Sequence, residues 1–132
     1  MTVMIMGVAI AVILGGVAAT IRFTDMHRKQ AVAGAYVRDF AEKVENGVAG
    51  TYTACASTTT YDAMYPLSDA NYERHTIAVA YWDGTKFVPP GSCTATNDSG
   101  VQRVSLQVKS TDGRADERLD VIIRKPCRIT PC

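Results

Sequence analysis

The feature that most constrains this chain is an uncharged apolar run at its N-terminus. The run, MTVMIMGVAIAVILGGVAATI, covers residues 1–21 of 132. As a helix rising ~1.5 Å per residue it would extend about 31 Å, close to the ~30 Å hydrocarbon core of a bilayer. It lacks the basic start of a secretory signal and exceeds the usual apolar core of one, although Ala18 and Ala19 leave cleavage as an alternative. We expect residues 1–24 to form a membrane-inserted helix.

The helical pattern continues beyond the apolar run. No Pro follows before Pro66, and no Gly before Gly34. Apolar residues then recur at the three- and four-residue spacing of one helical face: Ala33, Val37, Phe40, Ala41, Val44 and Val48. Gly47 and Gly50 suit a C-terminal end. The sequence therefore predicts one helix that begins at Thr2 and ends between about Asn46 and Val48, with an amphipathic half that begins at residue 25.

Small residues interrupt the apolar run, notably Gly7, Gly15 and Gly16. Small side chains let neighbouring helix backbones approach closely. Glycine also weakens a helix by about 1 kcal/mol relative to alanine, so the adjacent pair favours local unwinding. Small residues are also simply common in membrane helices. Close packing and a plain anchor remain open alternatives.

The head is expected to comprise residues 25–132, with a loop over 49–75, an antiparallel sheet over 76–125 and a cysteine-bearing tail over 126–132. Alternation over 76–82 indicates a strand with Ile77, Val79 and Tyr81 on one face. Asp83-Gly84 then predicts a two-residue hairpin loop before a short return strand over 86–88.

A second hairpin is predicted with its register. Segments 101–109 and 116–124 flank Asp112-Gly113, which places three pairs opposite one another: Leu106 with Leu119, Val104 with Val121, and Lys109 with Asp116. Apolar residues then meet apolar residues, and opposite charges meet. The expected fold class is α+β: about four antiparallel strands whose apolar face packs on Ala33, Val37, Phe40 and Val44.

Four cysteines lie in the head: Cys55, Cys93, Cys127 and Cys132. None forms a C-x-x-C motif and no histidine pair accompanies them, so a zinc site is poorly supported. Two disulfides are favoured over buried thiols, which would place the head in an oxidising compartment. Three pairings are possible, of which we favour Cys55–Cys93 and Cys127–Cys132.

The sequence offers no catalytic or cofactor-binding constellation. His27 and His75 have no nucleophile or carboxylate arrangement around them, so we expect no enzyme activity. Four acidic residues near the second hairpin do not follow a calcium-binding pattern and are interpreted as solvated charges: Asp112, Asp116, Glu117 and Asp120. The net charge of +1, without a basic stripe, gives no indication of nucleic acid as a partner.

Two segments carry a family resemblance: MTVMIMGVAIAVILGGVAATIRFTDMHRKQAVAGAYVRDFAEKVE and DGRADERLDVIIRKPC. With the expected architecture, they resemble the type IV pilin and type II secretion pseudopilin superfamily, in particular short prepilin-type proteins of high-GC Gram-positive bacteria. The resemblance implies a structural subunit that is trimmed by a prepilin peptidase, resides in the cytoplasmic membrane with its head outside, and then joins other pilin subunits in a surface filament through its N-terminal helix.

The fifth residue departs from the family pattern. Members usually carry a glutamate there, which pairs with a neighbouring N-terminal amine during assembly, whereas this chain has Ile5. Three explanations of this departure are open: the chain is a mature minor subunit, it begins inside a longer gene product, or its likeness to the family is only architectural. We expect Ile5, Gly7, Gly15 and Gly16 to be assembly residues of a minor subunit. The alternative is a single-pass envelope protein whose head binds a ligand or partner.

The charges after the apolar run oppose the expected orientation. Arg22, Arg28 and Lys29 follow the run and no cation precedes it. The positive-inside rule would place the head in the cytoplasm, whereas the expected disulfides would place it in an oxidising compartment. A removed basic leader would reconcile the two.

Overall fold

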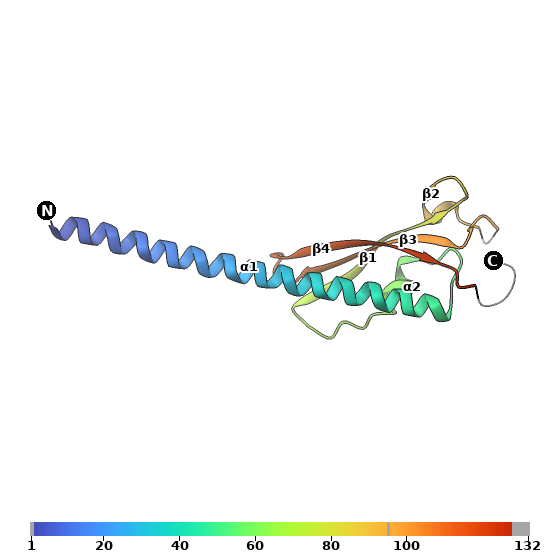
Figure 1. Ribbon diagram of the computed structural model, residues 1–132, viewed down its shortest axis with the longest axis horizontal. Coiled ribbons are helices and arrows are strands. Elements are labelled where there is room, and N and C mark those ends of the chain that lie inside the picture. Colours follow the sequence, from blue (N-terminus) through green and yellow to red (C-terminus); the bar gives the residue numbers. More distant parts are fainter. Residues whose placement is uncertain (1, 95, 128–132) are drawn as a thin grey trace.

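The structure of the chain, a computed structural model, describes residues 2–94 and 96–127, except for the side chains of residues 2–5, 8 and 9. Its elements are the helices α1 (Thr2–Gly50) and α2 (Thr58–Asp62), the strands β1 (Tyr72–Trp82), β2 (Phe87–Val88), β3 (Val101–Ser110) and β4 (Asp116–Arg124), and a 3-10 turn at Pro90–Ser92. Figure 1 shows that the second half of α1 lies along the sheet, while the first half projects beyond it. The expected α+β class is confirmed.

Helix α1 is continuous over 49 residues. The Gly15-Gly16 pair does not unwind it, and it ends at Gly50, beyond the predicted end. The additional turn is held because Val48 is 3% exposed and belongs to the core, which outweighs the weak helix propensity of the two flanking glycines.

The four strands form one antiparallel sheet in the order β2-β1-β3-β4. Strands β3 and β4 pair in the predicted register, with Leu106 opposite Leu119, Val104 opposite Val121, and Lys109 opposite Asp116. The sequence-based assignment of this hairpin is therefore confirmed pair by pair.

The core lies between the amphipathic half of α1 and the inner face of β1, β3 and β4. The predicted helix face supplies Ala33, Val37, Phe40 and Val44, none more than 4% exposed, and the sheet supplies Val104, Leu106 and Val108, each 0% exposed. Phe40 also stacks on Tyr65, with ring centroids 5.2 Å apart. Only this half of α1 packs in the core. Because α1 is one continuous helix, the packing of this half also sets the direction in which the other half projects.

Two expectations about β1 are wrong. The sequence predicts a loop over residues 49–75, but α2 lies within this segment and β1 already begins at Tyr72. Within β1, Ile77 is 45% exposed instead of sharing the inner face with Val79. The pairing with β3 shifts between Thr76 and Ala78, so Ile77 is the extra residue of a β-bulge and Thr76 takes the inner position.

Both hairpin connections are longer than two residues. Trp82 pairs with Phe87, so the first loop contains four residues, and the carboxylate of Asp83 accepts hydrogen bonds from the backbone N–H groups of Thr85 and Lys86 (both 2.8 Å). At the second loop, the backbone N–H of Ser110 donates to the carbonyl of Ala115 (2.9 Å), and the carboxylate of Asp112 accepts from the backbone N–H of Arg114 (3.2 Å). The Asp-Gly pairs mark the turns correctly, but side-chain hydrogen bonds favour wider loops than the dipeptide alone predicts.

Candidate functional site

The projecting half of α1 is an apolar surface that the chain leaves uncovered. Every side chain described between residues 6 and 24 is exposed. The large hydrophobic side chains among them are more than half exposed: Met6, Ile10, Val12, Ile13, Leu14, Val17, Ile21 and Phe23. From Ile10 onward the helix is long and apolar enough to cross a membrane. So large an apolar surface in water would promote association, so a membrane or other protein is expected to cover it. We call residues 2–24 the shaft.

Two threonine hydroxyls in the described part of the shaft are satisfied within the helix. The hydroxyl of Thr20 donates to the carbonyl of Gly16, and that of Thr24 donates to the carbonyl of Thr20, both at 2.9 Å. Each hydroxyl thus finds a partner without water, as an apolar environment requires.

The three shaft glycines make no packing contact with the described part of the chain. A Cβ atom placed on Gly7, Gly15 or Gly16 would meet nothing within 4 Å outside the local helix backbone. The fourth predicted assembly residue, Ile5, lies in α1, but its side chain is outside the described part of the structure. A reason for glycine at these positions must therefore come from outside this chain or from chance.

Where the shaft enters the head, four charged residues join α1 to the turn between β3 and β4. Lys29 forms an ion pair with Asp112 and lies 3.6 Å from Asp25. Arg114 contacts the carboxylate of Asp25 at 2.8 Å and that of Asp112 at 3.7 Å. We call this group of two cations and two anions the junction cluster.

The junction cluster shifts the titration of its members. The hydrogen bond from Lys29 lowers the pKa of Asp112 well below its usual range, and the hydroxyl of Ser110 adds to the effect. The same bond raises the pKa of Lys29. The two shifts widen the pH range over which both groups are charged and the ion pair that joins the β3–β4 turn to the helix can form.

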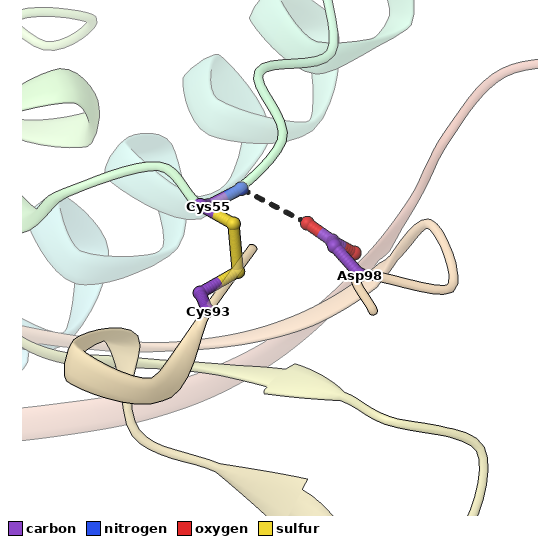
Figure 2. Close-up of side chains that lie close together, drawn as sticks. All are labelled: Cys55, Cys93 and Asp98. Atoms are coloured by element: carbon purple, nitrogen blue, oxygen red, sulfur yellow. Dashed lines mark hydrogen bonds between the residues drawn. A yellow bond between two sulfur atoms is a disulfide. The ribbon is translucent and has the colours of Figure 1, made fainter. Parts of the chain in front are cut away.

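At the opposite end of the head, a disulfide joins the segment after α1 to the segment before β3. Figure 2 shows Cys55 bonded to Cys93, the favoured pairing, with Asp98 beside it. The backbone N–H of Cys55 donates to the Asp98 carboxylate at 3.0 Å. Cys55 has a φ of 54°, a left-handed conformation that side chains rarely adopt, so the disulfide and this hydrogen bond hold a strained residue.

The disulfide borders a buried polar network. Gln102 is 0% exposed and donates to Asp98 (2.9 Å) and to the carbonyl of Thr53 (3.0 Å), while its oxygen accepts from Tyr61. The hydroxyl of Tyr52 donates to Asp98 at 2.8 Å. Burial raises the pKa of both tyrosines above the usual range. Burial also opposes ionisation of Asp98, but the hydrogen bonds that it accepts leave its pKa lowered.

This arrangement is a structural clamp and does not suit a metal. Cys55, Cys93 and Asp98 converge within ligand distance of one another, yet both sulfurs are consumed in the disulfide and Asp98 is occupied by hydrogen-bond donors. Cys127 is likewise disulfide-bonded, and its expected partner Cys132 lies outside the described residues.

The other candidate residues do not converge on a site. Asp112 belongs to the junction cluster, whereas Asp116 accepts from Gln107 at 2.6 Å and pairs with Arg118 at 3.3 Å. His75 is about half exposed beside Glu73 (3.6 Å). The sequence reasoning missed the junction cluster and the Gln102 network. A glutamine in the strongly apolar alternation of 101–108 was the available signal for the second.

No family model matches the sequence, and no curated protein and no solved structure matches the chain. Functional conclusions therefore depend on the geometry of the shaft and the head.

Proposed function

We propose that this chain is a structural subunit, of the minor kind, of a type IV pilus or a type II secretion-like pseudopilus. It waits in the membrane and then assembles with other pilin-like subunits through its N-terminal helix. The observation that carries the proposal is the exposed apolar shaft, which continues without a break into the helix that supports the head. A shaft fixed to a head in this way suits a rod that packs beside its neighbours.

Two features support a filament over a simple anchor. A continuous helix transmits the orientation of the shaft directly to the head, which an anchor does not need but a regular filament does. The shaft glycines leave open space on the helix surface, which favours close backbone approach by a neighbouring helix. The disulfide clamp of the head is consistent with an extracytoplasmic location.

Substitution of Gly16 by leucine distinguishes the two functions in cells of the native host. Gly16→Leu keeps the shaft apolar, so membrane insertion should be preserved, but a bulky side chain should prevent close helix packing. The matched control is Val12→Leu, at a position that already carries a bulky exposed side chain. Each variant, with an epitope tag on the head, is followed in the membrane fraction and in filaments sheared from the cell surface.

The filament proposal predicts that the native chain and Val12→Leu enter the sheared fraction, whereas Gly16→Leu remains in the membrane. If the native chain stays in the membrane fraction of cells that make filaments, the filament proposal is wrong. Equal amounts of all three chains in sheared filaments would remove the role assigned to Gly16.

A further inference from the structure

A shallow groove of about 320 Å³ lies on one side of α1, where the shaft meets the head. The apolar side chain of Ile21 lines the end of the groove toward the shaft, and the guanidinium of Arg28 lines the end toward the head. Three polar residues complete the lining: Thr20, Thr24 and Asp25. Ile21 and Arg28 are seven residues apart, so they lie on one helix face. The groove therefore has an apolar end directed toward the shaft and a cationic end directed toward the head.

The apolar end continues along the shaft. Ile10, Leu14 and Val17 recur at the helical period below Ile21, and these four side chains are 57%, 64%, 54% and 65% exposed, respectively. A chain-like apolar ligand would find a continuous strip of side chains there, with Arg28 above its upper end.

Near the cationic end, the carboxylate has charged partners among the described residues, whereas the two arginines do not. Asp25 already contacts Lys29 at 3.6 Å and Arg114 at 2.8 Å, so its carboxylate has two cationic partners. Arg22 and Arg28 are both exposed, and neither forms an ion pair within residues 2–94 and 96–127. The groove lining thus offers the free guanidinium group of Arg28, with that of Arg22 nearby on the helix, but no free carboxylate, which favours an anion over a ligand that carries an ammonium group.

The side chain of Arg28 is long enough to reach a lipid headgroup. Seven residues of helix separate it from Ile21, or about 10 Å, whereas a headgroup layer is about 5–7 Å thick. Helical side chains lean toward the N-terminus, which here is the membrane side, and a long arginine side chain spans the difference. Arg28 lines the groove together with Thr24 and Ile21, the two residues one and two turns below it.

We propose that Arg28 and this groove bind the phosphate of an anionic phospholipid, whose acyl chain lies along Ile10, Leu14, Val17 and Ile21. Arg22 adds to the local positive potential. The binding rests on the membrane residence in the proposed function and goes beyond it: it assigns the shaft a preferred lipid before assembly. Occupancy of the groove by lipid and by a neighbouring subunit would be mutually exclusive.

The test uses the full chain reconstituted into phosphatidylcholine vesicles that contain trace spin-labelled lipid. The fraction of label immobilised by the protein is compared for phosphatidylglycerol and phosphatidylcholine labels, which gives a relative association constant. We expect the native chain to prefer phosphatidylglycerol, and Arg28→Gln to lower that preference about fivefold, because the phosphate loses the charge-assisted hydrogen bonds that the guanidinium donates. Arg38→Gln is the matched control, since Arg38 is an exposed arginine of α1 that lies about 15 Å further from the shaft.

The outcomes separate the two proposals. A loss in Arg28→Gln without one in Arg38→Gln supports the groove. Equal losses in both variants would indicate a general charge effect and overturn it, as would a loss in Arg22→Gln but none in Arg28→Gln. Incorporation of the chain without any preference for phosphatidylglycerol contradicts only the lipid site. Failure of the chain to enter vesicles contradicts the membrane residence in the proposed function as well.

Discussion

Lys29, in the part of α1 just above the shaft, forms an ion pair with Asp112, which lies 83 residues later in the turn between β3 and β4. The pair joins the end of the sheet that carries the β3–β4 turn to the helix, at the point where the core ends. It therefore holds the β3–β4 turn against the helix, outside the apolar core of the head.

Replacing Asp112 by asparagine should loosen this attachment. We expect faster amide hydrogen exchange in residues 111–115 of the full chain in detergent, with little change in the exchange of the core strands. Both partners are partly exposed, so the effect on global stability should be small. Asp120→Asn, on the exposed face of β4, is the control and should change neither region.

The same substitution carries a pH dependence whose sign follows from the lowered pKa of Asp112. A carboxyl group with a depressed folded-state pKa stabilises the fold above its ordinary pKa of about 4, and this contribution is lost as the pH falls through the folded-state value. The difference in the free energy of unfolding between the native chain and Asp112→Asn should therefore be present at neutral pH and shrink in strong acid. A difference that grows on acidification would contradict the assigned ion pair.

Loss of the Cys55–Cys93 disulfide should destabilise the head by about 4 kcal/mol, the entropy model's value for a loop of this length. The left-handed conformation of Cys55 allows a sharper test. Glycine adopts that conformation without strain, so Cys55→Gly with Cys93→Ser should be about 1 kcal/mol more stable than Cys55→Ser with Cys93→Ser. Denaturant unfolding measures both differences, and equal stability of the two double variants would show that residue 55 relaxes once the disulfide is absent.

Gln102→Ala should cost about 3 kcal/mol in the free energy of unfolding. The substitution leaves the buried hydroxyl of Tyr61 and the carbonyl of Thr53 without the partner that Gln102 supplies, and it opens a cavity. Gln107→Ala is the matched control on the same strand, because Gln107 makes an exposed hydrogen bond to Asp116. It should change stability by less than about 0.5 kcal/mol. Similar losses in both variants would contradict a special role for the network.

Periodicity and residue pairing predicted the parts of this fold that depend on local sequence. The helical spacing of Ala33, Val37, Phe40 and Val44 marked the face that the sheet covers, and the charges of Lys109 and Asp116 agreed with the register of β3 and β4. The first pattern succeeded because only one face of this helix segment is apolar, and the second because only one register also places the apolar side chains of β3 and β4 on the buried face of the sheet.

The remaining features depend on contacts between distant segments. The bulge at Ile77 arises where β1 aligns with β3, and simple alternation in β1 does not contain that information. The junction cluster brings Asp25 to Arg114 across 89 residues. Single charges on a helix and in a turn do not specify each other, so only the assembled fold identifies the pair.

Two glycines of α1 provide a matched test of how firmly the helix is packed. An alanine Cβ at Gly34 would meet nothing within 4 Å, so Gly34→Ala should stabilise the chain by about 1 kcal/mol through helix propensity alone. At Gly47 the Cβ would lie 2.8 Å from the Sδ atom of Met64, which must move away, so Gly47→Ala should gain much less. Thermal unfolding of the two variants measures the difference. Equal gains would mean that Met64 leaves its place against the core at no cost, and the end of α1 would then be less tightly packed than its contacts indicate.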